Sequence, residues 1–397
     1  FRSIMATVAT GFAIGMVQSE LLALQSDWEW LPNVGLHDAI PFLLVLIALV
    51  WRADGAIGRG EIVTSGLPPA AEPRATIPAT LLVLAAAAAG LFLLDSQWRL
   101  AIMLSAIAAI MTLSVIVLTG FVGQISLATF ALAGTAAFAM VRATEDLSLP
   151  FPLAPALGVA VAVAIGTLAG LPAMRIRGLT LAIASLAAAV AVEELLFEWE
   201  WFTGGLGGSS VEPATLGPLD FDIQATGDAY PREAFGFLAL LTLLAAMIIV
   251  VNLRRSRTGW QWLAVRANER AAEALGISAR RVKLSANAMA AALAGVGGTL
   301  IAYQAQFISK DSFGALESLI VVAISYLAGI AAPIAALVAG GLTEGGLLTE
   351  ALDRMSDDAA SYQFAVSGLL LIVAAIKFPA GLVGTTSRLA RRKSSPA

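Results

Sequence analysis

Long apolar runs separated by short polar stretches make up most of this chain. A helix that crosses the hydrocarbon core of a bilayer needs ~20 consecutive apolar residues. About a dozen runs approach or reach that length, and they cover residues 4–24, 38–51, 77–95, 100–119, 121–141, 152–173, 179–197, 234–252, 282–304, 314–329, 331–348 and 362–377. The pattern predicts an all-α polytopic membrane protein with about 10 to 12 transmembrane or re-entrant helices.

Composition supports the same class of protein. Of the 397 residues, 58% are hydrophobic and only 13% are charged, whereas soluble domains carry roughly 25% charged residues. Polar side chains are therefore too few to cover the surfaces of globular domains. We expect the lipid bilayer to be the main solvent of this chain.

Several kinds of chemistry lack their residues. The chain has no Cys and a single histidine, His37, so it cannot build thiolate zinc sites, iron–sulfur clusters or multi-histidine metal centres. It contains no H-E-x-x-H or G-x-S-x-G motif and no G-x-x-x-x-G-K followed by Ser or Thr. The formal net charge of -4 argues against a nucleic-acid partner. We expect no metal or cofactor on this chain, and an enzyme is disfavoured.

The distribution of basic residues predicts the orientation, because cytoplasmic loops of membrane proteins are enriched in Lys and Arg. If residues 253–283 are cytoplasmic, 19 of the 24 basic residues lie on that side and both chain ends are cytoplasmic. The five basic residues left outside are Arg99, Arg142, Arg232, Lys310 and Arg354. Carboxylates concentrate in the outer loop 198–233, so we expect an acidic outer face.

The cytoplasmic loop 253–283 shows a helical pattern. Arg266, Glu269, Arg270 and Glu273 fall at i, i+3, i+4 and i+7, which predicts one charged helix face with Arg266 paired to Glu269 and Arg270 paired to Glu273. The other side of that helix is predicted to carry Trp260, Leu263, Ala264, Ala267, Ala271 and Leu275. Gly276 is placed to end the helix and Ser278 to cap the next one. The loop is either an amphipathic linker at the membrane surface or a helix presented to a cytoplasmic partner.

Four stretches resemble, in order, the permease subunits of ABC importers for branched-chain and other hydrophobic amino acids. They are LTGFVGQISLATFALAGTAAF from Leu118, MRIRGLTLAIASLA from Met174, FTGGLGGSS from Phe202, and GWQWLAVRANERAAEALGI with RVKLSANAMAAALAGVGGTL from Gly259. The resemblance implies partners: cytoplasmic ATPase subunits that bind ATP and Mg, a second permease half, and an extracytoplasmic substrate-binding protein. It implies a bacterial inner-membrane location and assigns ATPase coupling to Arg266, Asn268, Glu269, Arg270, Ala271, Ala272, Glu273 and Gly276.

The first 60 residues resemble the carboxyl-terminal end of the partner permease in such importers. Since the chain also starts with Phe1 rather than Met, we expect a fused permease that begins inside a longer protein. The predicted organisation is a first-half tail in 1–52, a Gly- and Pro-rich cytoplasmic linker in 53–76, a complete second half in 77–385 and a basic cytoplasmic tail in 386–397.

Two interruptions of apolar runs are candidates for the translocation path. Broken helices at bilayer depth are tolerated where protein or a cavity satisfies the freed backbone groups. The candidates are the glycines and proline at the two interruptions and the neutral polar residues near the first: Gly120, Gly123, Gln124, Ser126, Thr129, Gly329 and Pro333. Tight turns between ordinary helices are the alternative. No apolar segment carries Lys, Arg or His near its midpoint, which disfavours an ion-coupled carrier or channel.

Overall fold

The computed structural model describes residues 4–27, 35–52, 76–171, 179–224, 230–354 and 381–383. Within these ranges five helical segments are long and apolar enough to cross a membrane: Ser96–Val122, Thr180–Phe197, Glu233–Arg255, Ala279–Ala305 and Lys310–Ala328. Shorter apolar helices add to them at Val8–Leu24, Leu36–Ala48, Ile77–Leu93 and Leu153–Ala169. The predicted all-α polytopic membrane class is confirmed, while the predicted run 362–377, the linker 53–75 and the tail 386–397 lie outside the described residues.

Four tightly packed helices form the centre of the bundle. They are α4 (Ser96–Val115), which continues as the π-helical turn η2 (Ile116–Val122), α5 (Thr129–Glu145), α6 (Leu153–Ala169) and α12 (Ala279–Ala305). Glycines allow this close approach, because a Cβ added at Gly298 would lie 2.1 Å from the carbonyl oxygen of Ala133. Without a hydrophobic driving force between helices in lipid, small residues at such contacts are the usual means of packing.

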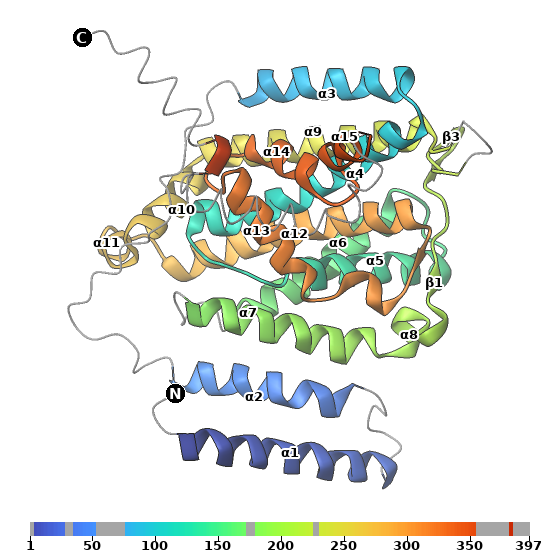
Figure 1. Cartoon of the computed structure of the whole chain (residues 1–397). Helices are drawn as coiled ribbons and strands as arrows, with labels where there is room; N and C mark the ends of the chain where they lie inside the picture. The colour runs from blue at the N-terminus through green and yellow to red at the C-terminus, as the bar shows by residue number, and fades with distance from the viewer. Residues whose placement is uncertain are drawn as a thin grey trace.

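Further helices cover the central four on two sides (Figure 1). On one side lie α9 (Glu233–Arg255), α3 (Thr76–Leu93), α13 (Glu317–Ala328), α14 (Ala335–Leu342) and α15 (Leu347–Asp353). On the other lie α7 (Leu179–Val192) with its π-helical extension η4 (Glu193–Phe197), then α2 (Leu36–Arg52) and α1 (Ile4–Asp27). With 8 residues, α14 is only about 12 Å long at ~1.5 Å per residue, so the predicted run 331–348 is not one spanning helix.

The two ends of the bundle differ in structure. One end, here called the strand end, carries α8 (Glu200–Thr203), β1 (Ser209–Ser210), β2 (Thr215–Leu216), β3 (Leu219–Asp220) and β4 (Phe307–Ile308), and it lies to the right in Figure 1. There β1 pairs with β4 and β2 with β3, both antiparallel. The opposite end, here called the coupling end, carries α10 (Arg257–Ala267) and α11 (Glu269–Ala274). The predicted outer loop 198–233 thus holds short regular elements among its irregular stretches.

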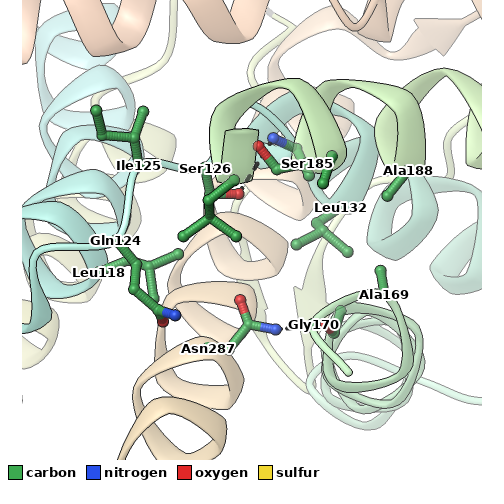
Figure 2. Close-up of a pocket in the computed structure, with 14 residues that line it drawn as sticks. Leu118, Gln124, Ile125, Ser126, Leu132, Ala169, Gly170, Ser185, Ala188 and Asn287 are labelled. Atoms are coloured by element: carbon green, nitrogen blue, oxygen red, sulfur yellow. Dashed lines mark hydrogen bonds between the residues drawn. The ribbon is translucent and has the colours of Figure 1, made fainter. Parts of the chain in front are cut away.

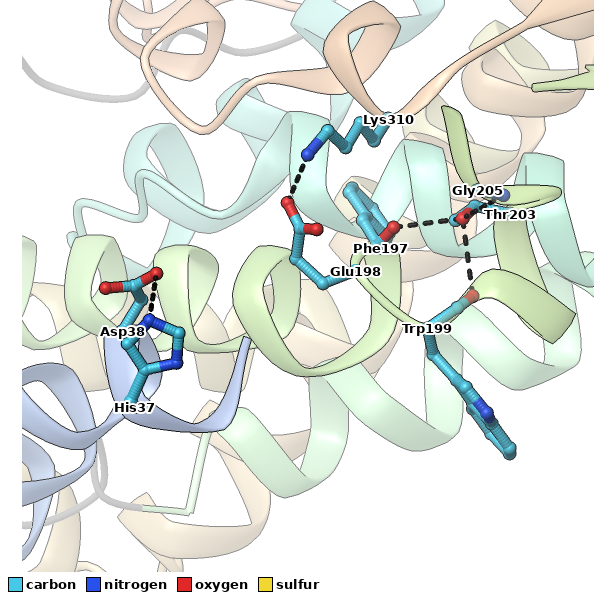
Figure 3. A network of polar contacts seen from close by, with 8 residues as sticks. All are labelled: His37, Asp38, Phe197, Glu198, Trp199, Thr203, Gly205 and Lys310. Carbon is cyan, nitrogen blue, oxygen red and sulfur yellow. Dashed lines mark hydrogen bonds and ion pairs between the residues drawn. The ribbon is translucent and has the colours of Figure 1, made fainter. Parts of the chain in front are cut away.

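Ion pairs organise the strand end. Each of the five basic residues predicted for this side contacts a carboxylate, as Figure 3 shows for Lys310 and Glu198. The pairs are Arg99 with Glu233 at 2.8 Å, Arg142 with Glu145 at 2.7 Å, Arg232 with Asp220 at 2.5 Å, Lys310 with Glu198 at 2.5 Å, and Arg354 with Asp95. Because the carboxylates outnumber these bases, the strand end remains acidic.

Candidate coupling and translocation site

The coupling end is built by an abrupt reversal of the chain after α9. Ser256 alone separates α9 from α10, and its hydroxyl accepts a hydrogen bond from the Gly259 amide at 3.4 Å as the N-cap of α10. A Cβ at Gly259 would lie 2.3 Å from the carbonyl oxygen of Leu253. Glycine at this position therefore allows α10 to leave the membrane helix at once.

Asn268 divides the helical segment that the sequence suggested. Its backbone is extended, with φ -161° and ψ 107°, and its side chain caps α11 by accepting from the Ala271 amide at 3.1 Å. Asn is among the best N-cap residues. The expectation of one continuous charged face is wrong, because Arg266 belongs to α10 while Glu269, Arg270 and Glu273 belong to α11.

The residues on either side of this break turn inward. Glu269 forms an ion pair of 2.8 Å with Lys283 of α12, and the two side chains are 14% and 6% exposed. Arg266 donates from Nη1 to the carbonyl oxygen of Gly120 at the end of the central helix, and burial lowers the pKa of this guanidinium. Arg266 and Glu269 are thus held by partners on other elements, in η2 and α12.

The remaining residues of α11 face away from the bundle. Arg270, Ala271, Glu273 and Gly276 are exposed, while Ala272 is buried. Two large apolar side chains are exposed beside them, Leu275 at 80% and Trp260 at 65%. We call this set, Trp260, Arg270, Ala271, Glu273, Leu275 and Gly276, the coupling surface.

The sequence correctly predicted how this segment ends but assigned the wrong tryptophan to its buried side. Gly276 has φ +82°, as a glycine that ends a helix does, and Ser278 caps α12. However, Trp262 rather than Trp260 is buried, at 1% exposure, and its Nε1 donates to the Ser285 hydroxyl at 3.0 Å. The apolar spacing of Trp262 and Val265, which is i,i+3, was the signal that could have identified the buried tryptophan.

The first predicted interruption borders a polar cavity. After η2, Gly123 adopts φ +79° and residues 123–128 leave the helix before α5 begins. Gln124 and Ser126 line a cavity of about 30 Å³ between α5, α6, α7 and α12 (Figure 2). The same space receives Ser185 from α7 and Asn287 from α12, which the sequence analysis missed. Asn287 is the one Asn in an alanine-rich helix, a signal that was available.

This cavity combines neutral polar groups with an apolar wall. Thr129 lines a second, smaller hollow that shares Ser126, Leu132 and Asn287 with the first. Gln124 is 7% exposed and its Nε2 is buried without a hydrogen-bond partner. A space of about 30 Å³ accommodates a water molecule and is too small for an amino acid.

The second interruption takes a different role. Gly329 has φ +128°, and the residues between α13 and α14 are buried. Neither Gly329 nor Pro333 is among the residues that line the two cavities. This turn instead packs against η2, because a Cβ added at Gly120 would lie 2.1 Å from the carbonyl oxygen of Ile330. The seven predicted path residues therefore divide into cavity-lining and supporting groups.

The described residues hold no cluster of three or more His, Asp or Glu placed to bind a metal ion. What they define is a polytopic α-helical membrane protein with a small cavity between its helices and a set of exposed charged and apolar side chains at one end. The chain matches the family described as branched-chain amino acid transport system / permease component over residues 97–375, and it belongs to that family. Its members are transporter subunits rather than enzymes.

Two curated relatives carry the same description. The chain is 33% identical over 252 residues to the high-affinity branched-chain amino acid transport system permease protein LivM of Escherichia coli, which is 59% of this chain and 58% of that protein. It is 33% identical over 253 residues to LivM of Salmonella typhimurium, with 60% and 58% covered. The chain thus spans about 58% of the length of these relatives. No solved structure gives a significant match.

Proposed function

We propose that the chain is the permease component of an ABC importer that carries branched-chain amino acids or a related hydrophobic or neutral solute. A separate ATPase drives the transport, and that subunit holds the ATP and Mg. The observation that carries the proposal is the coupling surface: α11 presents Arg270, Glu273 and Leu275 outward while the buried Glu269–Lys283 pair fixes its other side. A helix held in this way can transmit force from a partner into the bundle.

The proposed orientation places the coupling end in the cytoplasm of a bacterial inner membrane and the strand end outside. Eight basic residues lie in 253–283. Because Lys and Arg are enriched in cytoplasmic loops, this count supports a cytoplasmic position for the coupling end. The strand end keeps an excess of carboxylates after its five bases are paired, which suits a surface that receives a substrate-binding protein. Both chain ends are then cytoplasmic.

The cavity favours an uncharged or zwitterionic solute with an apolar side chain. Its lining supplies amides and hydroxyls from Gln124, Ser126, Ser185 and Asn287 beside Leu118 and Leu132, with no charged side chain among the lining residues. An amino acid requires polar groups for its carboxylate and ammonium and an apolar wall for its side chain. The complete path requires two permease halves. Residues 1–52 are the proposed tail of the first half, which is fused to the second half in 77–385.

The direct test is reconstitution with the cognate ATPase and binding protein in liposomes. We expect uptake of leucine, isoleucine or valine that requires ATP, and we expect Glu273→Arg to reduce both ATPase association and uptake by at least tenfold. The matched control is Glu212→Arg at the strand end, an equally exposed charge reversal, which should leave ATPase association unchanged. Uptake by the permease alone, driven by a proton or sodium gradient, would show instead that the protein is a secondary carrier.

A further inference from the structure

The coupling end and both chain interruptions meet at one junction. The junction brings together Arg266 of α10, Gly120 of η2 and Ile330 of the α13–α14 turn. Along the chain, Gly120 and Arg266 are 146 residues apart, and Arg266 and Ile330 are 64 residues apart. We propose that Arg266 is a positioning residue that couples movement of α10 and α11 to η2, and so to the segment 123–128 that borders the cavity. The inference rests on the proposed function, because it concerns how the ATPase would act on the path.

The carbonyl oxygen of Gly120 requires a partner from outside its helix. At the end of η2 the Gly123 amide donates to Thr119 and the Gln124 amide donates to Leu118, both at 3.1 Å. These two bonds leave the Gly120 carbonyl without the amides that would normally reach it, and helix ends generally leave such groups unsatisfied. Arg266 supplies the hydrogen bond, so the end of η2 is completed by a side chain of the coupling segment.

A second arginine holds the next residue of η2. The guanidinium of Arg254, in the last turn of α9, lies 5.8 Å from the centre of the Phe121 ring, and both side chains are buried. A cation over an aromatic face is attracted by the ring, more strongly when water is excluded. Arg254 and Arg266 lie on either side of the reversal at Ser256. The two helices that meet at this reversal therefore hold successive residues of η2.

The far side of η2 is held against the second interruption. A Cβ added at Gly120 would lie 2.1 Å from the carbonyl oxygen of Ile330. The turn between α13 and α14 therefore packs directly on η2. A π-helical turn is an uncommon element that often occurs at functional sites, and it is the element that both the coupling segment and the cavity segment adjoin.

These contacts give a route of about three links from the coupling surface to the cavity. Movement of α11 is passed through the one-residue junction at Asn268 to α10, then through Arg266 to the Gly120 carbonyl. From there it reaches Gly123 and the cavity-lining Gln124 and Ser126. Contact alone does not establish coupling. The test must therefore include a measurement that a purely structural arginine would not change.

The decisive variants are Arg266→Gln and Arg266→Lys in the complete complex with the ATPase and binding protein. Arg280→Gln, at an exposed site on α12 outside the coupling surface, is the matched control for loss of an arginine charge. We expect Arg266→Gln to retain the ATPase and its basal hydrolysis but to transport at least tenfold less solute per ATP. Arg266→Lys keeps a donor for the Gly120 carbonyl and should recover part of that ratio. Arg280→Gln should leave the ratio unchanged.

A conformational measurement separates coupling from assembly. The chain has no Cys, so Ser126→Cys introduces a single thiol at the cavity. With native Arg266 we expect the labelling rate of this thiol to change at least threefold when ATP and binding protein are added, and with Arg266→Gln we expect no change. Solute-per-ATP ratios at the native value in both Arg266 variants would overturn the inference.

The remaining outcomes are also decisive. If Arg266→Gln does not fold, Arg266→Lys decides: a folded variant with a reduced ratio supports the inference, and one with the native ratio overturns it. If both variants fail to fold, Arg266 is a structural residue and the inference is overturned. If the native complex shows no ATP-dependent uptake, the proposed function fails, an outcome distinct from native uptake that Arg266 variants do not alter.

Discussion

The two ends of the bundle differ in how far most of their charged residues are exposed to solvent. At the strand end the Asp220–Arg232 and Asp95–Arg354 pairs are exposed to solvent, and they tie loops together at the surface. At the coupling end the Glu269–Lys283 pair and the Arg266 and Arg254 guanidinium groups lie within the protein, where they join separate helices. Exposed pairs contribute little to stability, whereas removal of one member of a buried pair leaves an uncompensated charge. The exposed pairs therefore mainly set surface charge, whereas the buried groups fix helix positions, and at the strand end these include Arg99 of α4, which pairs with Glu233 of α9.

The largest expected effect is at the buried pair. Lys283→Ala would remove the 2.8 Å ion pair from the Glu269 carboxylate, which is 14% exposed, and we expect the free energy of unfolding to fall by about 3 to 5 kcal/mol. Thermal unfolding of the purified protein in detergent measures the change. Arg280→Ala, an exposed site on the same helix, should stay within about 0.5 kcal/mol. Equal losses in the two variants would show that the pair has no special weight.

A smaller effect is expected where η2 meets the α13–α14 turn. Gly120→Ala would bring a Cβ to 2.1 Å from the Ile330 carbonyl, and such overpacking typically costs about 1 to 3 kcal/mol. Gly341→Ala is the control, because a Cβ at that helical position has nothing within 4 Å and Ala is the better helix former. We expect the two alanine substitutions to shift the unfolding temperature in opposite directions. A shift of the same sign and size would argue against the close contact.

The end of α11 should respond to backbone conformation alone. Gly276 has φ +82° and open space around it, so the Cβ of Gly276→Ala would meet no neighbour. The left-handed backbone is unfavourable for Ala, and we expect the free energy of unfolding to fall by roughly 1 kcal/mol. Gly276→Asn should lose less, since Asn tolerates this conformation. Both the unfolding temperature and the affinity for the ATPase should follow the order Gly, Asn, Ala. An Ala variant as stable as the native chain would contradict the assignment of a left-handed end.

The smallest effect is expected at the strand end. A hydrogen bond from Arg232 holds the pKa of the Asp220 carboxyl below its usual value, so the pair contributes above the unfolded-state pKa of ~3.9 and is lost as the pH falls through the lower folded-state pKa. Because both side chains are exposed, this contribution is small, and Asp220→Asn should lower the unfolding temperature at pH 7 only slightly. Any difference should shrink further in acid and in high salt. A large loss at pH 7 would remove the contrast between the two ends.

The sequence by itself determined the class of fold and several local features. Apolar runs of membrane-spanning length fix an all-α bundle, because a bilayer leaves no other partner for the backbone groups of such runs. The conformation of Gly276 and the cap at Ser278 were also predictable, since both depend on neighbours within a few residues. Gln124, Ser126 and Thr129 were correctly grouped, because they follow one another along the chain. The division into 1–52, 53–76, 77–385 and 386–397 stays a prediction.

Only the tertiary structure decided which charges pair and which face outward. The i,i+3 spacing suggested that Arg266 pairs with Glu269, but the cap at Asn268 breaks the helix between them and frees both side chains for distant partners. Gly120 is 146 residues from Arg266 and Lys283 lies on another helix, so no local pattern contains these contacts. Asn287 likewise joins Gln124 at the cavity only once α12 is packed against α5. Spacing along a helix limits which neighbours are possible, but the burial of a charge depends on how the whole bundle packs around it.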